Sequence, residues 1–119
     1  MEREILNSYS ILNSLNVSRE TFFDFEIFIS MIKEKNKEIN IISQETSEKK
    51  VIRERHITDS AQIIEFVDLN SNIITDIGSG GGMPGIVISI MIKNHKKSVK
   101  FHLYEKSHHK SSCHYCARV

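Results

Sequence analysis

Residues 76–86 read D-I-G-S-G-G-G-M-P-G-I, and this stretch decides the fold of the chain. The run of residues 72–77 leads into this stretch. It is short and rich in apolar, β-branched residues, as is typical of a buried parallel strand. The apolar residues 85–91 predict a helix that opens at Pro84, because proline suits the first helical turn. A strand, a glycine turn and a helix bring backbone amides and a helix N-terminus against an anionic ligand group. The stretch therefore predicts a small-molecule site.

A second strand is predicted after this helix. Residues 98–104 alternate between polar and apolar side chains and end at Glu105. A strand, a helix and a second strand form one right-handed crossover in which the two strands are parallel. We therefore expect an α/β fold, with residues 71–106 forming the first half of a cofactor-binding domain.

The residues before the first strand have helical periodicity. Residues 4–42 predict two amphipathic helices around a turn near Asn16, with Ser18 and Thr21 as a cap for the second helix. Residues 51–69 predict another helical stretch, within which Thr58 or Asp59 could cap a second piece. Residues 1–70 are thus expected to form an N-terminal helical segment.

An aromatic cluster lies within the second of these helices. Phe22, Phe23, Phe25 and Phe28 could offer a stacking surface for nucleic acid. Their helical spacing instead favours packing in the core.

Composition and charge set limits on the kind of protein. With 119 residues, 39% of them hydrophobic and 26% charged, the chain suits one globular domain. Residues 1–92 carry 9 Lys and Arg against 14 Asp and Glu, whereas residues 93–119 carry 7 against 1. That basic end could attract phosphate backbones or form a solvated surface. No stretch resembles a membrane span or a signal peptide, so we expect a cytoplasmic protein without a membrane partner.

The tail, residues 107–119, has neither helical nor strand periodicity and is rich in His, Cys and Ser. His109, Cys113 and Cys116 are ligand types that suit zinc. A structural zinc site usually pairs two ligand couples across a longer loop, and here the candidates crowd into residues 108–116. We therefore expect no metal site.

The acids at the two strand ends indicate which ligand the glycine loop would hold. Gly80, Gly82 and Gly85 match the spacing of a dinucleotide fingerprint, which is a weak signal alone. Asp76 would place a negative charge near a pyrophosphate, so a ligand with an ammonium group, such as S-adenosylmethionine, fits better. Glu105 could accept hydrogen bonds from two ribose hydroxyls. The alternatives are a loop without ligand and a solvated strand end.

Three motifs in the same order resemble a known family. They are N-K-E-I-N-I-I-S at residues 36–43, R-H-I-T-D-S at residues 55–60, and the glycine stretch itself. Together they resemble the ribosomal small-subunit methyltransferase G family, also called glucose-inhibited division protein B, over residues 15–106. The resemblance implies a class I, Rossmann-like methyltransferase that uses S-adenosylmethionine. It also implies methylation of guanine N7 in 16S ribosomal RNA, with the RNA or the 30S subunit as partner.

The resemblance also assigns roles to residues. The cofactor-binding positions that it implies are Asp76, Gly78, Gly80, Met83 and Glu105. Asn40 falls near the active site, with a catalytic role possible. Arg55, His56 and Asp59 fall on a helix that supports the cofactor loop. We interpret His56 as a structural histidine, since its place in the motif does not make it a catalytic base. Methylation at N7 needs no base, because this atom has a lone pair and no proton.

The family pattern continues past Glu105 with further strands and helices that this chain does not show. We therefore expect a fold that is truncated after the first strand–helix–strand unit, an incomplete sheet, and a chain that is inactive or impaired by itself. The alternatives are a non-catalytic remnant that binds RNA or cofactor and, less favoured, a dinucleotide-binding protein.

Overall fold

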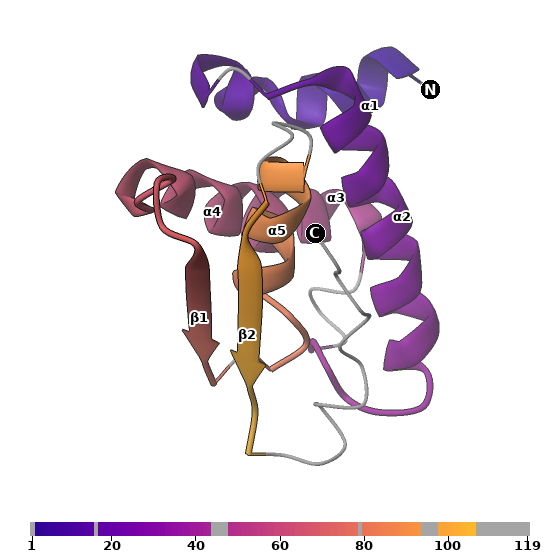
Figure 1. Ribbon diagram of the computed structural model, residues 1–119. Helices are drawn as coiled ribbons and strands as arrows, with labels where there is room; N and C mark the ends of the chain where they lie inside the picture. The colour runs from indigo at the N-terminus through magenta and orange to yellow at the C-terminus, as the bar shows by residue number, and fades with distance from the viewer. Residues whose placement is uncertain (1, 16, 44–47, 79, 94–97, 107–119) are drawn as a thin grey trace.

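The computed structural model describes residues 2–15, 17–43, 48–78, 80–93 and 98–106. Within these residues the protein is α/β, with helices packed against one face of a two-stranded parallel sheet (Figure 1). In chain order the elements are α1 (Glu2–Ser8), η1 (Ser10–Leu15), α2 (Arg19–Asn36), α3 (Lys49–Val51), η3 (Ile52–Ile57), α4 (Thr58–Ala61), η4 (Gln62–Phe66), β1 (Ile73–Ile77), α5 (Gly85–Lys93) and β2 (Lys100–Tyr104). None of the helices in these residues has both the length and the apolar character to cross a membrane.

The sheet confirms the predicted parallel pairing. Ile73 of β1 lies opposite Lys100 of β2, and Ile77 lies opposite Tyr104. The amide of Gly78 donates to the carbonyl of Tyr104 at 2.7 Å and so continues the ladder past the end of β1. Helix α5 joins the strands and packs between β2 on one side and α2 and α4 on the other.

The expectation of a buried first strand is wrong for one of its faces. The side chains of Ile73 and Ile77 are 53% and 84% exposed. Both belong to the face that points away from α5, because side chains alternate along a strand. The apolar residues of β1 could be buried from both sides, but the described helices cover only one.

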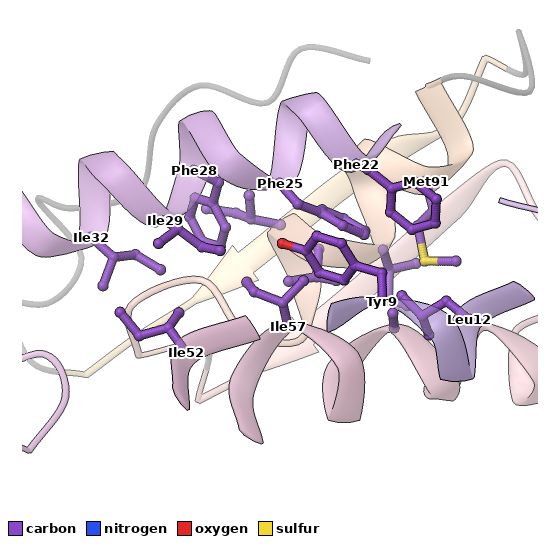
Figure 2. Packing of buried hydrophobic residues seen from close by; sticks show 14 of the residues in the cluster. Tyr9, Leu12, Phe22, Phe25, Phe28, Ile29, Ile32, Ile52, Ile57 and Met91 are labelled. Carbon is purple, nitrogen blue, oxygen red and sulfur yellow. The ribbon is translucent and has the colours of Figure 1, made fainter. Parts of the chain in front are cut away.

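The hydrophobic core lies between the helices and includes α5 (Figure 2). The ring of Tyr9 stacks on Phe22, with centroids 5.0 Å apart, and Phe25 packs beside both rings. Phe28 is also buried, so the interpretation of the aromatic cluster as core is confirmed for these three phenylalanines. Phe23 is 47% exposed and lies on the outer face of α2.

Helix α2 begins as predicted and ends earlier than predicted. The Ser18 hydroxyl accepts from the amide of Thr21 at 3.3 Å, which confirms the cap. The helical periodicity continues to residue 42, but the helix stops at Asn36. The side chain of Asn36 binds the amides of Ile41 and Ile42 and thereby closes a turn in place of another helical turn.

The helical stretch before the sheet runs from Lys49 to Phe66 with changing pitch. Its middle part, η3, is a π-helix. The prediction of a new cap at Thr58 or Asp59 is wrong, because Ile57 has helical backbone angles and the helix passes through without a break. The Thr58 side chain is instead buried.

A candidate cofactor-binding edge

The glycine loop connects β1 to α5 and has an unusual backbone. Gly78, Gly80 and Gly82 have φ angles of 75°, 54° and 103°. Residues with a side chain rarely adopt these angles, whereas glycine does so at little cost. The glycines are therefore required by the path of the chain, and this path brings the loop over the carboxyl ends of both strands.

Two acidic side chains hold this loop. The Asp76 carboxylate accepts from the amide of Gly85 at 2.9 Å, and the Glu105 carboxylate accepts from the amide of Gly80 at 2.5 Å. The carboxyl ends of parallel strands meet at one edge of the sheet, which is where such folds bind ligands. The structure thus brings Asp76, Gly80 and Glu105 together, as the sequence predicts.

The N-terminus of α5 differs from the expectation. The sequence predicts that its amides face an anionic ligand group, but the first of them, that of Gly85, donates to Asp76. The amide of Ile86 donates to the carbonyl of Gly82 at 2.6 Å. A carboxylate at a helix N-terminus is favourable for the helix and repels a second anion.

Close packing explains the remaining glycines of the loop. A Cβ atom on Gly85 would lie 2.5 Å from Leu103 Cδ2 and 2.7 Å from Asp76 Oδ2. A Cβ on Gly81 would overlap Ile41 Cγ2. Beside Gly78, in contrast, a Cβ would meet no atom of the described residues within 4 Å, so these residues leave open space at this part of the loop.

Of the other predicted residues, Asn40 lies next to a residue that contacts the loop, and Met83 belongs to the loop itself. Asn40 is exposed and directly precedes Ile41, which packs on Gly81. Met83 is half-buried and packs against the hydrophobic core. The structure therefore places the 36–43 motif beside the glycine loop, although the two are far apart in sequence.

The motif residues Arg55, His56 and Asp59 lie on the helical run from η3 to α4. Arg55 is exposed. Asp59 is also exposed. Together with Ile11 and Phe66, it lines a pocket of about 400 Å³. This pocket lies between η1 and η4, and none of the residues that line it belongs to the glycine loop.

His56 is half-buried on the π-helix, a type of segment that is frequent at functional sites. Burial lowers the pKa of its imidazole, the charge of Arg55 lowers it further, and the charge of Asp59 opposes both. Its Nε2 atom is buried, and among the described residues it has no hydrogen-bond partner. These features favour a neutral, structural histidine.

Sequence reasoning missed three residues at this edge: Asn36, Ile41 and Gly81. Asn36 and Ile41 belong to the N-K-E-I-N-I-I-S motif, so their place in that motif was the available signal. The contact between Ile41 and Gly81 depends on the tertiary fold, which the motif does not report.

The described residues hold no group of three or more His, Cys, Asp or Glu side chains that could bind a metal ion. The Cys and His residues of the tail, considered above for zinc, lie outside the described residues.

The parallel strands, the glycine loop and the acids at the strand ends define an incomplete Rossmann-like fold of the methyltransferase type. The sequence model of the family GidB, rRNA small subunit methyltransferase G, matches residues 22–114. The chain belongs to this family, which confirms the resemblance. The match begins after residue 15 and extends past Lys106, where we expected the resemblance to end.

Relatives that carry the name ribosomal RNA small subunit methyltransferase G agree with this assignment. The protein of Pelagibacter ubique is 72% identical over 92% of this chain and 51% of its own length. That of Orientia tsutsugamushi is 42% identical over 72% of this chain and 43% of its own length. That of Cereibacter sphaeroides is 35% identical over 87% of this chain and 49% of its own length. The chain thus spans about half the length of these relatives. No solved structure matches it.

Proposed function

We propose that this chain supplies the S-adenosylmethionine-binding part of an enzyme that methylates guanine N7 in 16S ribosomal RNA. Family membership and the names of the relatives support a role in methylation of small-subunit ribosomal RNA. The proposal goes further than this support: it also names the cofactor, the target atom and the small ribosomal subunit as the partner.

The pair of acids around the glycine loop carries the proposal. The carboxylate of Asp76 accepts a hydrogen bond from the first amide of α5, and the carboxylate of Glu105 accepts one from the amide of Gly80 in the loop. Two carboxylates at this edge repel a pyrophosphate, which disfavours a dinucleotide. They favour a ligand that offers positive charge and hydroxyl donors. S-adenosylmethionine has a sulfonium, an ammonium and two ribose hydroxyls. Its one carboxylate still leaves it with a net positive charge, whereas a dinucleotide carries a negative pyrophosphate.

The residues present fit this cofactor. The open space beside Gly78 leaves room for a ligand, and Glu105 is an acceptor at the end of the second strand, where a ribose is expected. Asp76, Gly80 and Met83 complete the proposed binding set. When bound, S-adenosylmethionine would supply an electrophilic methyl group.

The chemistry at guanine N7 asks for orientation more than for acid or base catalysis. N7 carries a lone pair and no proton, so no residue has to remove one. Asn40 is exposed beside the loop and is proposed to face the target base. Arg55, His56 and Asp59 are proposed to support the site through the helical layer, with His56 neutral.

Calorimetric titration of the 119-residue chain with S-adenosylmethionine and, separately, with NAD tests the ligand. We expect binding of S-adenosylmethionine and little binding of NAD. Gly80→Asp adds a carboxylate beside Glu105 and should weaken binding by about tenfold or more. Thr75→Ala, on the exposed face of β1, is the control and should bind as the unchanged chain does. Binding of NAD without binding of S-adenosylmethionine would overturn the proposal.

A methyl-transfer assay on small ribosomal subunits that lack the modification tests the reaction. We expect transfer by this chain alone to be absent or severely impaired, because the chain spans about half the length of its relatives. Transfer at the rate of an ordinary enzyme would show that the described half of the fold is sufficient.

A further inference from the structure

Asn36, the last residue of α2, shapes the chain that follows the helix. Its Oδ1 atom accepts from the amide of Ile41 at 2.8 Å and from the amide of Ile42 at 3.0 Å. The amide of Ile41 also donates to the carbonyl of Ile39 at 3.0 Å. One side-chain oxygen therefore closes the turn formed by residues 37–42.

This turn lies between the hydrophobic core and the glycine loop. Ile42 is 7% exposed and belongs to the core cluster. The preceding residue, Ile41, packs closely on Gly81, so that a Cβ atom added to Gly81 would overlap the side chain of Ile41. The bonds from Asn36 reach the amides of these two residues. They thus hold the backbone at the two residues that join the core to the loop.

We propose that Asn36 is a positioning residue for the cofactor loop and acts on it through Ile41. The inference rests on the proposed function, since it concerns the same site. The hydrogen bonds of the Asn36 side chain reach Ile41 and Ile42, whereas the contact with the loop is made by Ile41. By holding Ile41 against Gly81, it keeps the segment between Gly80 and Gly82 in place, and it also fixes the neighbouring Asn40.

The role requires only a hydrogen-bond acceptor at this position. Asn36→Asp retains an acceptor of the same length, whereas Asn36→Ala removes it and takes this acceptor from the amide of Ile42. A buried amide without a partner is costly, so the turn should open in the alanine variant. The pair of variants therefore separates the acceptor role from the mere size of the side chain.

Calorimetry with S-adenosylmethionine and hydrogen exchange at the amides of Ile41 and Ile42 test the proposal in the full chain. In Asn36→Ala we expect about tenfold weaker binding and faster exchange at both amides. Asn36→Asp should restore both properties to near those of the unchanged chain. Ser18→Ala removes the cap at the other end of α2 and controls for general loss of helix stability. It should leave affinity within about twofold of the unchanged chain.

A double-mutant cycle with Ile41→Ala tests the route of the effect. If Asn36 acts through Ile41, then Asn36→Ala should weaken binding little further in a chain that already carries Ile41→Ala. Independent, additive effects would overturn this route. Binding by the unchanged chain with equal binding by Asn36→Ala would overturn the role of Asn36 alone. Absence of binding by the unchanged chain would overturn the proposed function itself.

Discussion

The two faces of the parallel sheet are covered very differently. On the inner face, Ile74, Phe101 and Leu103 pack against the hydrophobic core and α5. On the outer face, Ile77 and Tyr104 lie opposite each other across the strands and are 84% and 57% exposed. Sheets of this class normally carry helices on both faces. The sheet of this protein, as described, is therefore stabilised mainly from one side.

The covered face is also the one that builds the site. The alternation that directs Ile74 inward directs Asp76 inward as well, where its carboxylate meets the first amide of α5. Gly85 allows this approach, because any side chain there would collide with Leu103 and Asp76. Packing of the inner face and the geometry of the loop are thus two results of the same contacts.

The largest effect is expected from truncating matched isoleucines on the two sides. Ile92, on the helix that covers the inner face, is 1% exposed, whereas Ile77 on the outer face is largely exposed. Ile92→Ala should lower the free energy of unfolding by about 2–5 kcal/mol, because it leaves a cavity. Ile77→Ala should change it by less than about 0.5 kcal/mol.

Urea denaturation followed by circular dichroism measures both values. The slope with denaturant should stay the same in both variants, so that the shift in midpoint reports stability. Equal losses in the two variants would show that something covers the outer face in solution.

A smaller effect is expected from filling the space at Gly85. In Gly85→Ala the added Cβ would lie 2.5 Å from Leu103 Cδ2, and such overpacking costs about 1–3 kcal/mol. In a chain that carries Leu103→Ala, the same substitution should cost less, because the nearest colliding atom is gone. Denaturation of the two single variants and the double variant gives the interaction energy. Full additivity would contradict the close contact between α5 and the inner face.

The elements of this fold were largely predictable from the sequence, because periodicity reports local burial. The alternation at residues 98–104 and the apolar run at 72–77 identified both strands, and the glycines marked the loop. The acids Asp76 and Glu105 could be placed at one edge because parallel strands end together.

What the sequence could not supply depends on side-chain contacts that the periodicity of the chain does not report. The end of α2 at Asn36 results from a side chain that competes with the helix for amides, whereas the apolar pattern simply continues. The packing of Ile41 on Gly81 joins two motifs that are far apart in the chain. Likewise, the apolar residues of β1 show which faces could be buried, but not what covers them.

The smallest effect concerns His56, the half-buried histidine of η3. Burial lowers the pKa of His56, with Arg55 contributing and Asp59 opposing. The unfolded chain, with an ordinary histidine pKa of about 6.5, therefore binds more protons than the folded chain just below that pH. The contribution of His56 to the free energy of unfolding is therefore fully present above a pH of about 6.5. It is lost as the pH falls toward the lower pKa of the folded state.

Thermal unfolding between pH 8 and pH 5 measures this dependence in the unchanged chain and in His56→Gln. The substitution removes the titrating group, so stability should fall less steeply with acidification than in the unchanged chain. Thr75→Ala, at an exposed position of the outer face, leaves every titrating group in place and should keep the original slope. An equal change of slope in both variants would mean that the slope does not report the titration of His56.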